Sequence, residues 1–321
     1  QMPTWADNPD SSENLFDWDV PTGPASGLFT RYYQQASSGN FIALGDYLQA
    51  PSNHGVFQVY TPDSVVSLGD VFAAVDSALG NTITTAHSYN SINDFDRWTI
   101  GVSNDPYTGP ALHKISPSTE SPRKFDHVMF VWRNKRGNNG TGSGSPWTTG
   151  LSLLGFGINT YSQFGAYDKV PIDIMRHEFA HFLYGHNNFH TGGGGWGLGS
   201  QYFITLGNGW SNMGLSNASL NSWNAWDRQR MGWKAVDQTF EISARRLDLT
   251  EANGDLDVND PGDAGTYILR DFVTSGDALR IKLPFTDPNA EYPEFLWVEN
   301  HQGKVVNNCP QQGSTTAPCL V

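Results

Sequence analysis

The sequence of 321 residues has little positive charge, only two cysteines and no long apolar run. Its 19 Lys and Arg against 32 Asp and Glu give a formal net charge of −13, which argues against binding to nucleic-acid phosphates or to an anionic membrane. No stretch approaches the ~18 consecutive apolar residues of a membrane span. The cysteines form no CxxC pair, so a cysteine zinc site or a dithiol redox motif is excluded. A glycine-rich phosphate loop and a nucleophile elbow are also missing.

Charged residues make up 16% of the chain, whereas aromatic residues reach 13% and glycine occurs 34 times. This composition is typical of a folded protein and not of a disordered one. Cys309 and Cys319 lie close together in a segment rich in Pro, Gly, Gln and Thr. A disulfide there would stabilise the fold by about 2–3 kcal/mol, with two free thiols as the alternative. The acidic composition and the expected disulfide favour a secreted, extracellular protein.

Hydrophobic periodicity predicts strands first, two key helices in the middle and strands last, which is an α+β arrangement. The run 128–132 is apolar throughout and predicts a central, buried strand. Expected strands cover 41–50, 56–60, 97–102, 125–133, 151–161, 266–272, 278–283 and 294–302, and expected helices cover 67–79, 171–185 and 222–231.

The most informative string is His177-Glu178-Phe179-Ala180-His181, an H-E-x-x-H motif. It lies in a helical pattern with Pro171 suited to the first turn and Gly185 suited to the end. One face of this helix is apolar and is expected to be buried, through Ile172, Met175, Phe179 and Phe182.

His177 and His181 are four residues apart and therefore project only about 40° from each other around the helix axis. Two imidazole nitrogens so placed can hold one zinc ion at about 2.0–2.1 Å. Glu178 is turned by about 100°, which suits a role on a water molecule better than a role as ligand. The alternative is a surface helix with two incidental histidines.

A catalytic zinc ion takes three protein ligands and leaves one position open. No Glu occurs between Glu178 and Glu241, so a glutamate from a later helix is excluded as the third ligand. The nearby candidates are His186 and His190.

These residues resemble the metzincin clan of zinc endopeptidases, whose pattern is H-E-x-x-H-x-x-G-x-x-H followed by a turn that carries a Met beneath the zinc. Residues 210–214, with Met213, resemble that Met-turn. Residues 221–233 and 294–302 resemble the helix and a later strand of secreted bacterial peptidases of the immune-inhibitor-A type. The resemblance covers about residues 125–302.

The sequence also departs from the clan pattern. Tyr184 occupies the position of the motif glycine, and Gly185 follows one residue late. Asn187 occupies the position of the third ligand, and Leu215 stands where some metzincins carry a tyrosine near the zinc. The clan's third ligand and that tyrosine are therefore not transferred directly to this chain.

Helix geometry favours His190 over His186 as the third ligand. In a helix continuing through Gly185, His186 would lie about 180° around the axis from His177. If Gly185 instead ends the helix, His186 follows at once and no residues remain to bring it back to the metal. His190 has four residues in which to return, and the longer loop costs little closure entropy. We predict His190, with His186 as the alternative.

The resemblance implies a secreted zinc endopeptidase that acts on protein or peptide substrates, with Glu178 as the general base. It also implies one catalytic module with an upper subdomain, 1–190, and a lower subdomain, 191–321, and a metzincin-like fold. By the same resemblance, residues 151–161 would form the edge strand that pairs with an extended substrate. Two alternatives are an inactive peptidase fold that binds glycan or protein, and a zinc hydrolase of cell-wall amides.

A second candidate metal site is acidic. It consists of Glu251, Asp255, Asp257, Asp260 and Asp263, whose carboxylates suit Ca²⁺. Their spacing does not match an EF-hand, so a solvated turn is the alternative reading.

Overall fold

The computed structural model describes residues 15–46, 48, 68–80, 98–102, 112–117, 121–132, 141–143, 151–165, 172–183, 223–284, 294–302, 305–306 and 319–320. The chain divides into two compact units. Unit 1 comprises Gln1–Gln34 and Ile42–Asn188, and unit 2 comprises Gln35–Phe41 and Phe189–Val321. Both contain helices and small sheets, so the expected mixture of α and β structure is confirmed. The expected upper and lower peptidase subdomains stay a prediction.

The largest sheet of unit 1 has the strand order β3-β6-β4. Strand β3 (Lys124–Trp132) runs parallel to β6 (Phe156–Gly165), whereas β4 (Thr141–Ser143) and β5 (Ser152–Leu153) pair with β6 antiparallel. Among the described strands, β6 is therefore central. Among the described residues β3 pairs with β6 alone, so the expectation of a central strand at 128–132 stays a prediction.

The apolar run of β3 is covered by helices. Val128 and Phe130 pack against a hydrophobic cluster at helix α2, and the His127 ring lies against helix α4. Helices that cover both faces of a sheet make its strands apolar throughout.

Residues 151–161 form two strands, not one. Leu154 (φ 56°) and Gly155 (φ 79°) make a two-residue turn between β5 and β6, as mirror-image hairpin turns require. The Leu154 N–H donates to the Asp76 carboxylate at 2.6 Å, which holds the turn against α2. The expected substrate-pairing edge strand at 151–161 is therefore wrong, because β6 is paired on both sides.

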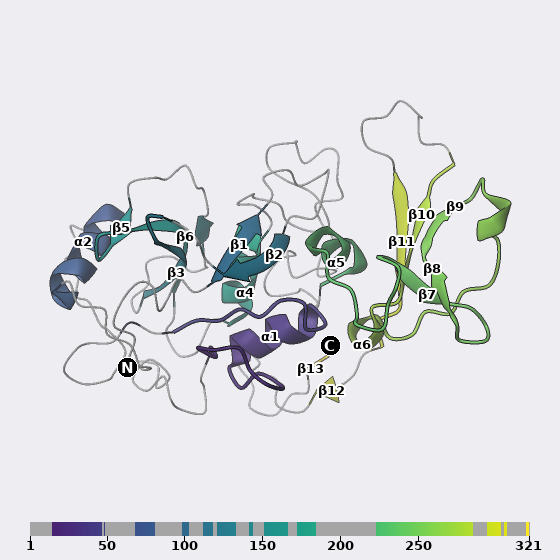
Figure 1. The fold of residues 1–321 in the computed structure, drawn as a ribbon, viewed down its shortest axis with the longest axis horizontal. Coiled ribbons are helices and arrows are strands. Elements are labelled where there is room, and N and C mark those ends of the chain that lie inside the picture. Colours follow the sequence, from purple (N-terminus) through teal and green to yellow (C-terminus); the bar gives the residue numbers. More distant parts are fainter. Residues whose placement is uncertain are drawn as a thin grey trace. The chain divides into compact units, whose positions relative to one another are not determined.

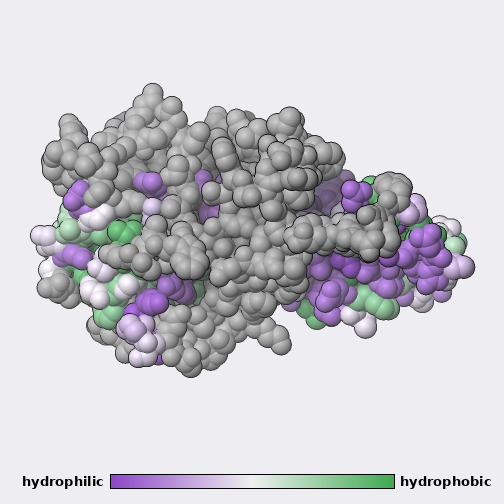
Figure 2. Space-filling model, turned by 90° about the horizontal axis from the view of Figure 1, so that it is seen from above, coloured by the Kyte–Doolittle hydropathy of each residue, from purple (hydrophilic) through white to green (hydrophobic). Residues whose placement is uncertain are grey.

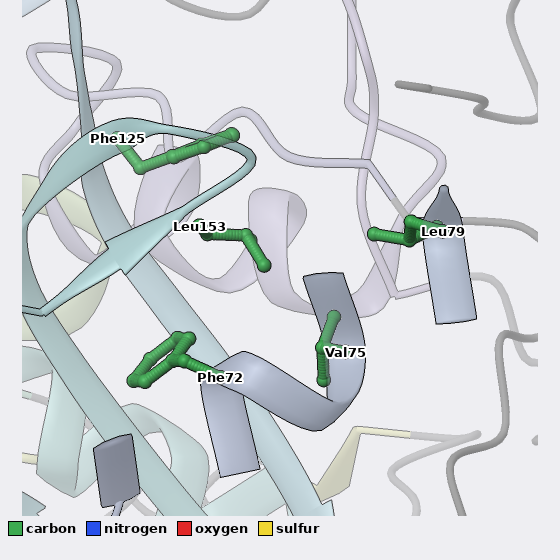
Figure 3. Close-up of a cluster of buried hydrophobic side chains, with 5 residues drawn as sticks. All are labelled: Phe72, Val75, Leu79, Phe125 and Leu153. Carbon is green, nitrogen blue, oxygen red and sulfur yellow. The ribbon is translucent and has the colours of Figure 1, made fainter. Parts of the chain in front are cut away.

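Helix α2 (Leu68–Leu79) confirms the expected helix, and Gly80 ends it with φ 61°. Its buried face packs against the sheet in a cluster of Phe72, Val75, Leu79, Phe125 and Leu153 (Figure 3). A separate antiparallel pair joins β1 (Trp98–Val102), which the sequence predicts, to β2 (Leu112–Pro117), which it does not.

Helix α1 (Leu28–Ala36) was not expected from the sequence pattern. The Asp17 carboxylate accepts hydrogen bonds from the N–H groups of Ser26 and Gly27 at 2.9 and 3.0 Å, next to the start of the helix. This anion satisfies N–H groups at a helix N-terminus. Because Asp17 lies about ten residues before the helix, rules that consider only the residues next to a helix end do not predict this contact.

The described part of the expected strand at 41–50 is mostly irregular. Residues 41–46 are not in a strand. The Thr30 hydroxyl donates to the Ala43 carbonyl at 2.7 Å, and the Phe41 N–H donates to the Ser37 hydroxyl at 2.9 Å. Side chains of α1 and the turn after it thus satisfy backbone groups that a sheet would otherwise pair. The expected strand at 56–60 lies outside the described residues.

In unit 2, helix α5 (Ala225–Met231) begins three residues later than expected and ends as predicted at Gly232, with φ 68°. Asn224 is its N-cap and forms a reciprocal capping box with Asp227. Trp223, at the start of this segment, is fully buried and its ring meets that of Trp233 edge to face at 4.9 Å.

The C-terminal part is rich in strands, as expected. Strand β10 (Ala278–Lys282) lies between β9 (Asp255–Asp257), which runs parallel, and β11 (Phe295–Glu299), which runs antiparallel (Figure 1). These strands confirm the predictions at 278–283 and 294–302. The other short elements of unit 2 are β7 (Ser243–Arg245), β8 (Glu251–Asn253), the 3₁₀ helix η4 (Pro261–Asp263), α6 (Phe272–Ser275), β12 (Val305–Val306) and β13 (Cys319–Leu320).

The expected strand at 266–272 is wrong. Only isolated bridges occur at Ile268 and Asp271, and Phe272 begins α6. The segment is fixed by side chains instead: the Arg270 guanidinium donates to the buried Asp277 carboxylate at 2.7 and 3.0 Å. Phe272 then enters a core cluster with Ala225, Ile242 and Ala278.

Gly254 joins β8 to β9 where no side chain fits, since a Cβ there would lie 2.4 Å from the Ala278 carbonyl oxygen.

The acidic segment does not assemble a calcium site in the described residues. Asp255 pairs with Arg280, Asp257 pairs with Lys282 at 3.2 Å, and Asp260 caps η4. No three His, Cys, Asp or Glu side chains gather as a ligand set anywhere in the described ranges. Figure 2 shows hydrophilic side chains over the described surface of this region. We therefore leave Ca²⁺ out of the proposed function.

Glu251 is held by three donors. Its carboxylate accepts from the N–H groups of Thr239 and Phe240 at 2.7 and 3.3 Å and from the Ser243 hydroxyl at 2.6 Å. Burial raises the pKa of this carboxyl, but the hydrogen bonds outweigh burial and lower the pKa to about 2. A pKa lowered in this way stabilises the fold at pH values above 4.5, the ordinary pKa of the group in the unfolded chain. This stabilisation is lost as the pH falls toward 2.

Glu251→Gln is therefore expected to flatten the acid dependence of thermal unfolding. The wild-type melting temperature should fall more steeply between pH 5 and pH 2 than that of the variant. The exposed Glu241 supplies the matched control Glu241→Gln, which should follow the wild type. Equal slopes for wild type and Glu251→Gln would contradict the role of these hydrogen bonds.

Among the described residues, none of the helices combines the length and apolar character needed to cross a bilayer. Strands β12 and β13 pair antiparallel, with Val306 opposite Cys319. Cys309 lies outside the described residues, so the disulfide with Cys319 stays a prediction.

Candidate metal site

Helix α4 (Ile172–Leu183) carries the H-E-x-x-H motif and confirms the predicted helix over its described length. The four residues of the expected apolar face are all buried: Ile172, Met175, Phe179 and Phe182. Pro171 and Gly185, expected at its two ends, lie outside the described residues. The sequence pattern thus gives the position and the buried face of this helix correctly.

The polar residues of the motif are buried as well. His177 and Glu178 are each 7% exposed and His181 is 6% exposed. Incidental histidines on a surface helix would instead be solvated. Polar groups of this kind are seldom buried unless partners or function keep them there.

The two imidazoles have the separation that a shared metal ion requires. Their ring centroids are 4.9 Å apart, with the ring planes at 89°. Two imidazoles bound tetrahedrally to one zinc at about 2.0–2.1 Å would have centroids about 5 Å apart. The separation of the two rings therefore agrees with that of two zinc-bound imidazoles, which are two of the three ligands that a catalytic zinc ion takes.

Glu178 lies next to one of these rings. Its Oε2 atom is 3.9 Å from Nε2 of His181, which is beyond direct hydrogen-bond range. The carboxylate therefore lies within ion-pair distance of the imidazole nitrogen, on the same helix and one turn away. This arrangement suits a proton carrier better than a third ligand.

Helix α1 holds one side of α4 (Figure 1). The Tyr33 hydroxyl donates to the Arg176 carbonyl oxygen at 2.8 Å, and the Arg176 guanidinium lies 4.3 Å from the centre of the Tyr32 ring. Phe29 and Tyr33 meet the Phe179 ring edge to face, at 5.4 and 5.3 Å. The contacts all fall on the turn that carries His177 and Glu178.

Strand β3 contributes His127, whose ring lies 5.1 Å from Phe179 and 5.4 Å from Phe182. Its Nδ1 and Nε2 atoms are each 2.6 Å from a hydroxyl, of Thr160 and Ser162 on β6. The Thr160 hydroxyl already donates to the Asp126 carbonyl, so it accepts from Nδ1, which therefore carries a proton. His127 thereby ties the two parallel strands to the underside of α4.

Several predicted site residues lie outside the described part of the chain. These are the third-ligand candidates His186 and His190, the interruption at Tyr184 and Gly185, and the Met-turn residue Met213. The structure brings together His177, Glu178 and His181, and no third metal-ligating side chain joins them among the described residues. His190 as third ligand stays a prediction.

Sequence reasoning missed Tyr33 and His127. Tyr33 is 143 residues from its hydrogen-bond partner, and neither residue belongs to a motif. The only local signal for Tyr33 in the sequence is the pair of adjacent tyrosines, Tyr32 and Tyr33, on helix α1. A correct α1 prediction would have drawn attention to its buried face.

Comparison with protein-family models, with curated proteins and with solved structures finds no match for this chain.

Proposed function

We propose that this protein is a secreted zinc-dependent endopeptidase with a metzincin-like catalytic module. The observation that carries the proposal is the buried pair His177 and His181, whose rings are 4.9 Å apart on one helix with Glu178 beside them. The resemblance of the wider sequence to metzincins supports the choice of peptide bonds as substrate.

In this proposal, imidazole nitrogens of His177, His181 and His190 would hold the zinc ion. Bound zinc would supply a Lewis acid that polarises the scissile carbonyl and acidifies a water molecule. The Glu178 carboxylate accepts the proton of the attacking water and delivers it to the leaving amine. Burial of Glu178 on α4 keeps the carboxylate in a fixed position and limits its exchange of protons with bulk water.

We further propose that the substrate pairs with β4. Of the described strands, β4 lies at the edge of its sheet, runs antiparallel to β6 and lies beside α4. An extended peptide can add to such an edge by main-chain hydrogen bonds. This replaces the segment 151–161, in which the longer strand β6 is paired on both sides.

Proline substitutions in β4 test this pairing. Adjacent residues of a strand direct their N–H groups to opposite edges, so one of Thr141→Pro and Gly142→Pro removes an outward donor. We expect that variant to raise KM for an extended peptide severalfold while zinc content stays unchanged. Cleavage at the wild-type KM by both variants would contradict substrate pairing at β4.

The proposal as a whole is tested by incubating the protein with casein, with and without a zinc chelator, and identifying the products by mass spectrometry. We expect internal cleavage of casein that the chelator stops and added zinc restores. Zinc binding with release of peptidoglycan fragments and intact casein would favour the cell-wall amidase. Intact casein and peptidoglycan would favour the inactive binding module.

A further inference from the structure

We propose that Tyr33 is a positioning residue for the metal site: its buried hydroxyl fixes the peptide group from which His177 projects. This inference rests on the proposed zinc site. It assigns a role in that site to helix α1, which the motif does not include.

The hydrogen bond acts directly on the backbone of the first ligand. The Tyr33 hydroxyl donates to the carbonyl oxygen of Arg176 at 2.8 Å. This carbonyl and the His177 N–H belong to the same planar peptide group. A carbonyl oxygen has two lone pairs, so it can accept from Tyr33 in addition to a helical N–H. Tyr33 therefore limits rotation of the peptide plane that sets the direction of the His177 side chain.

The same turn is fixed at its other end by ring contacts. The Tyr33 ring meets the ring of Phe179, which directly follows Glu178, at 5.3 Å and 73°. Tyr33 thus contacts the residue before His177 and the residue after Glu178. A single side chain holds both ends of the segment that carries a ligand and the proton carrier.

The hydroxyl remains a donor over the working pH range. Tyr33 is fully buried. Burial is the main cause that raises its pKa well above the ordinary value of 10, Tyr32 raises it further, and Arg176 acts in the opposite direction. Leaving this buried hydroxyl without an acceptor would be costly, so the bond to Arg176 is expected to persist.

His127 packs against the same helix as Tyr33, but it makes a different type of contact. It contacts the rings of Phe179 and Phe182, whereas its nitrogens face hydroxyls of β6. It therefore anchors α4 to the sheet through side chains. Tyr33 differs in that it donates directly to the backbone beside a proposed ligand.

Tyr33→Phe in the full chain tests the inference, because it removes the hydroxyl and keeps the ring. Zinc affinity is measured by chelator competition, and ligand geometry by the visible spectrum of the Co²⁺-substituted protein. We expect zinc affinity to fall roughly 10- to 100-fold, as for lost residues that orient metal ligands. The Co²⁺ spectrum should change, and kcat should fall while KM stays near the wild-type value.

Two controls separate positioning from general stability. Tyr161→Phe removes a hydroxyl from another buried tyrosine of unit 1, whose ring packs on Phe130. Phe72→Leu weakens the cluster at α2 and lowers the melting temperature without touching α4. Both should keep the wild-type zinc affinity and Co²⁺ spectrum.

The outcomes distinguish this inference from the function on which it rests. A wild type that binds zinc, together with a Tyr33→Phe variant of equal zinc affinity and unchanged Co²⁺ spectrum, would overturn the role of Tyr33 alone. A wild type that binds neither metal would overturn the zinc site and this inference together. Amide hydrogen exchange in the metal-free protein adds a measurement that does not depend on metal. Relative to the wild type, Tyr33→Phe should speed up exchange more in α4 than in α2.

Discussion

Glu178→Gln is expected to retain zinc and fold but to lose peptide hydrolysis by about 10²- to 10⁴-fold in kcat. Glutamine has the shape of the buried glutamate, so the packing of α4 is preserved. It cannot accept the proton of the attacking water, and it has no proton to pass to the leaving amine. The measurements are kcat on a fluorogenic peptide and zinc content by elemental analysis.

The matched control for this variant is Glu251→Gln, which makes the same chemical change in unit 2 at a carboxylate that bonds Thr239, Phe240 and Ser243. It should lower stability near neutral pH, flatten the acid dependence of unfolding and leave kcat near the wild-type value. Full activity in Glu178→Gln would exclude Glu178 as the general base. Loss of zinc in that variant would show that the carboxylate acts on the metal site and not on the proton.

The second large effect is expected at the third ligand. His190→Ala should weaken zinc binding by at least about 10²-fold, because two imidazoles alone make an incomplete site. His186→Ala removes a neighbouring imidazole by the same substitution and should retain near-stoichiometric zinc. Zinc affinity measured by chelator competition compares the two variants directly.

The reverse pattern, with zinc lost from His186→Ala and kept by His190→Ala, would assign the third ligand to His186. In that case the chain would have to turn back to the metal immediately at Gly185. Retention of zinc by both variants would place the third ligand elsewhere in the chain.

The helix of the motif could be predicted from the sequence because its signals are local. Apolar residues recur at helical spacing from Ile172 to Phe182, and the structure buries this face as expected. The same holds for α2, where Gly80 ends an apolar helical pattern. In both helices, periodicity and end signals agree with the tertiary packing.

Long-range contacts account for the features that the sequence did not predict. The N–H groups next to the start of α1 bond to Asp17 outside the helix, and Tyr33 bonds Arg176, 143 residues away. The apolar run of β3 indicates covering by α2 and α4, but it does not specify which strands lie beside it. The turn at Leu154-Gly155 lacks the usual Asn-Gly or Asp-Gly signal, so one strand was expected where two occur.

In the candidate site too, local spacing predicts some features and long-range contacts determine the others. Spacing alone brings His177 and His181 to one side of α4 and leaves Glu178 beside them, and the ring separation of 4.9 Å agrees with that prediction. Residues that hold this helix in place come from α1 and β3, and no motif marks them. The third ligand depends on the chain after α4, which lies outside the described residues. The sequence offers His186 and His190 as nearby candidates, and helix geometry favours His190.

The most direct test of the zinc site is X-ray absorption at the zinc edge of the purified wild-type protein, together with its metal content. We predict one zinc per chain, with three histidine nitrogens at about 2.0–2.1 Å and no sulfur ligand. Absence of stoichiometric zinc after reconstitution, or a first shell without at least two imidazoles, would contradict the account.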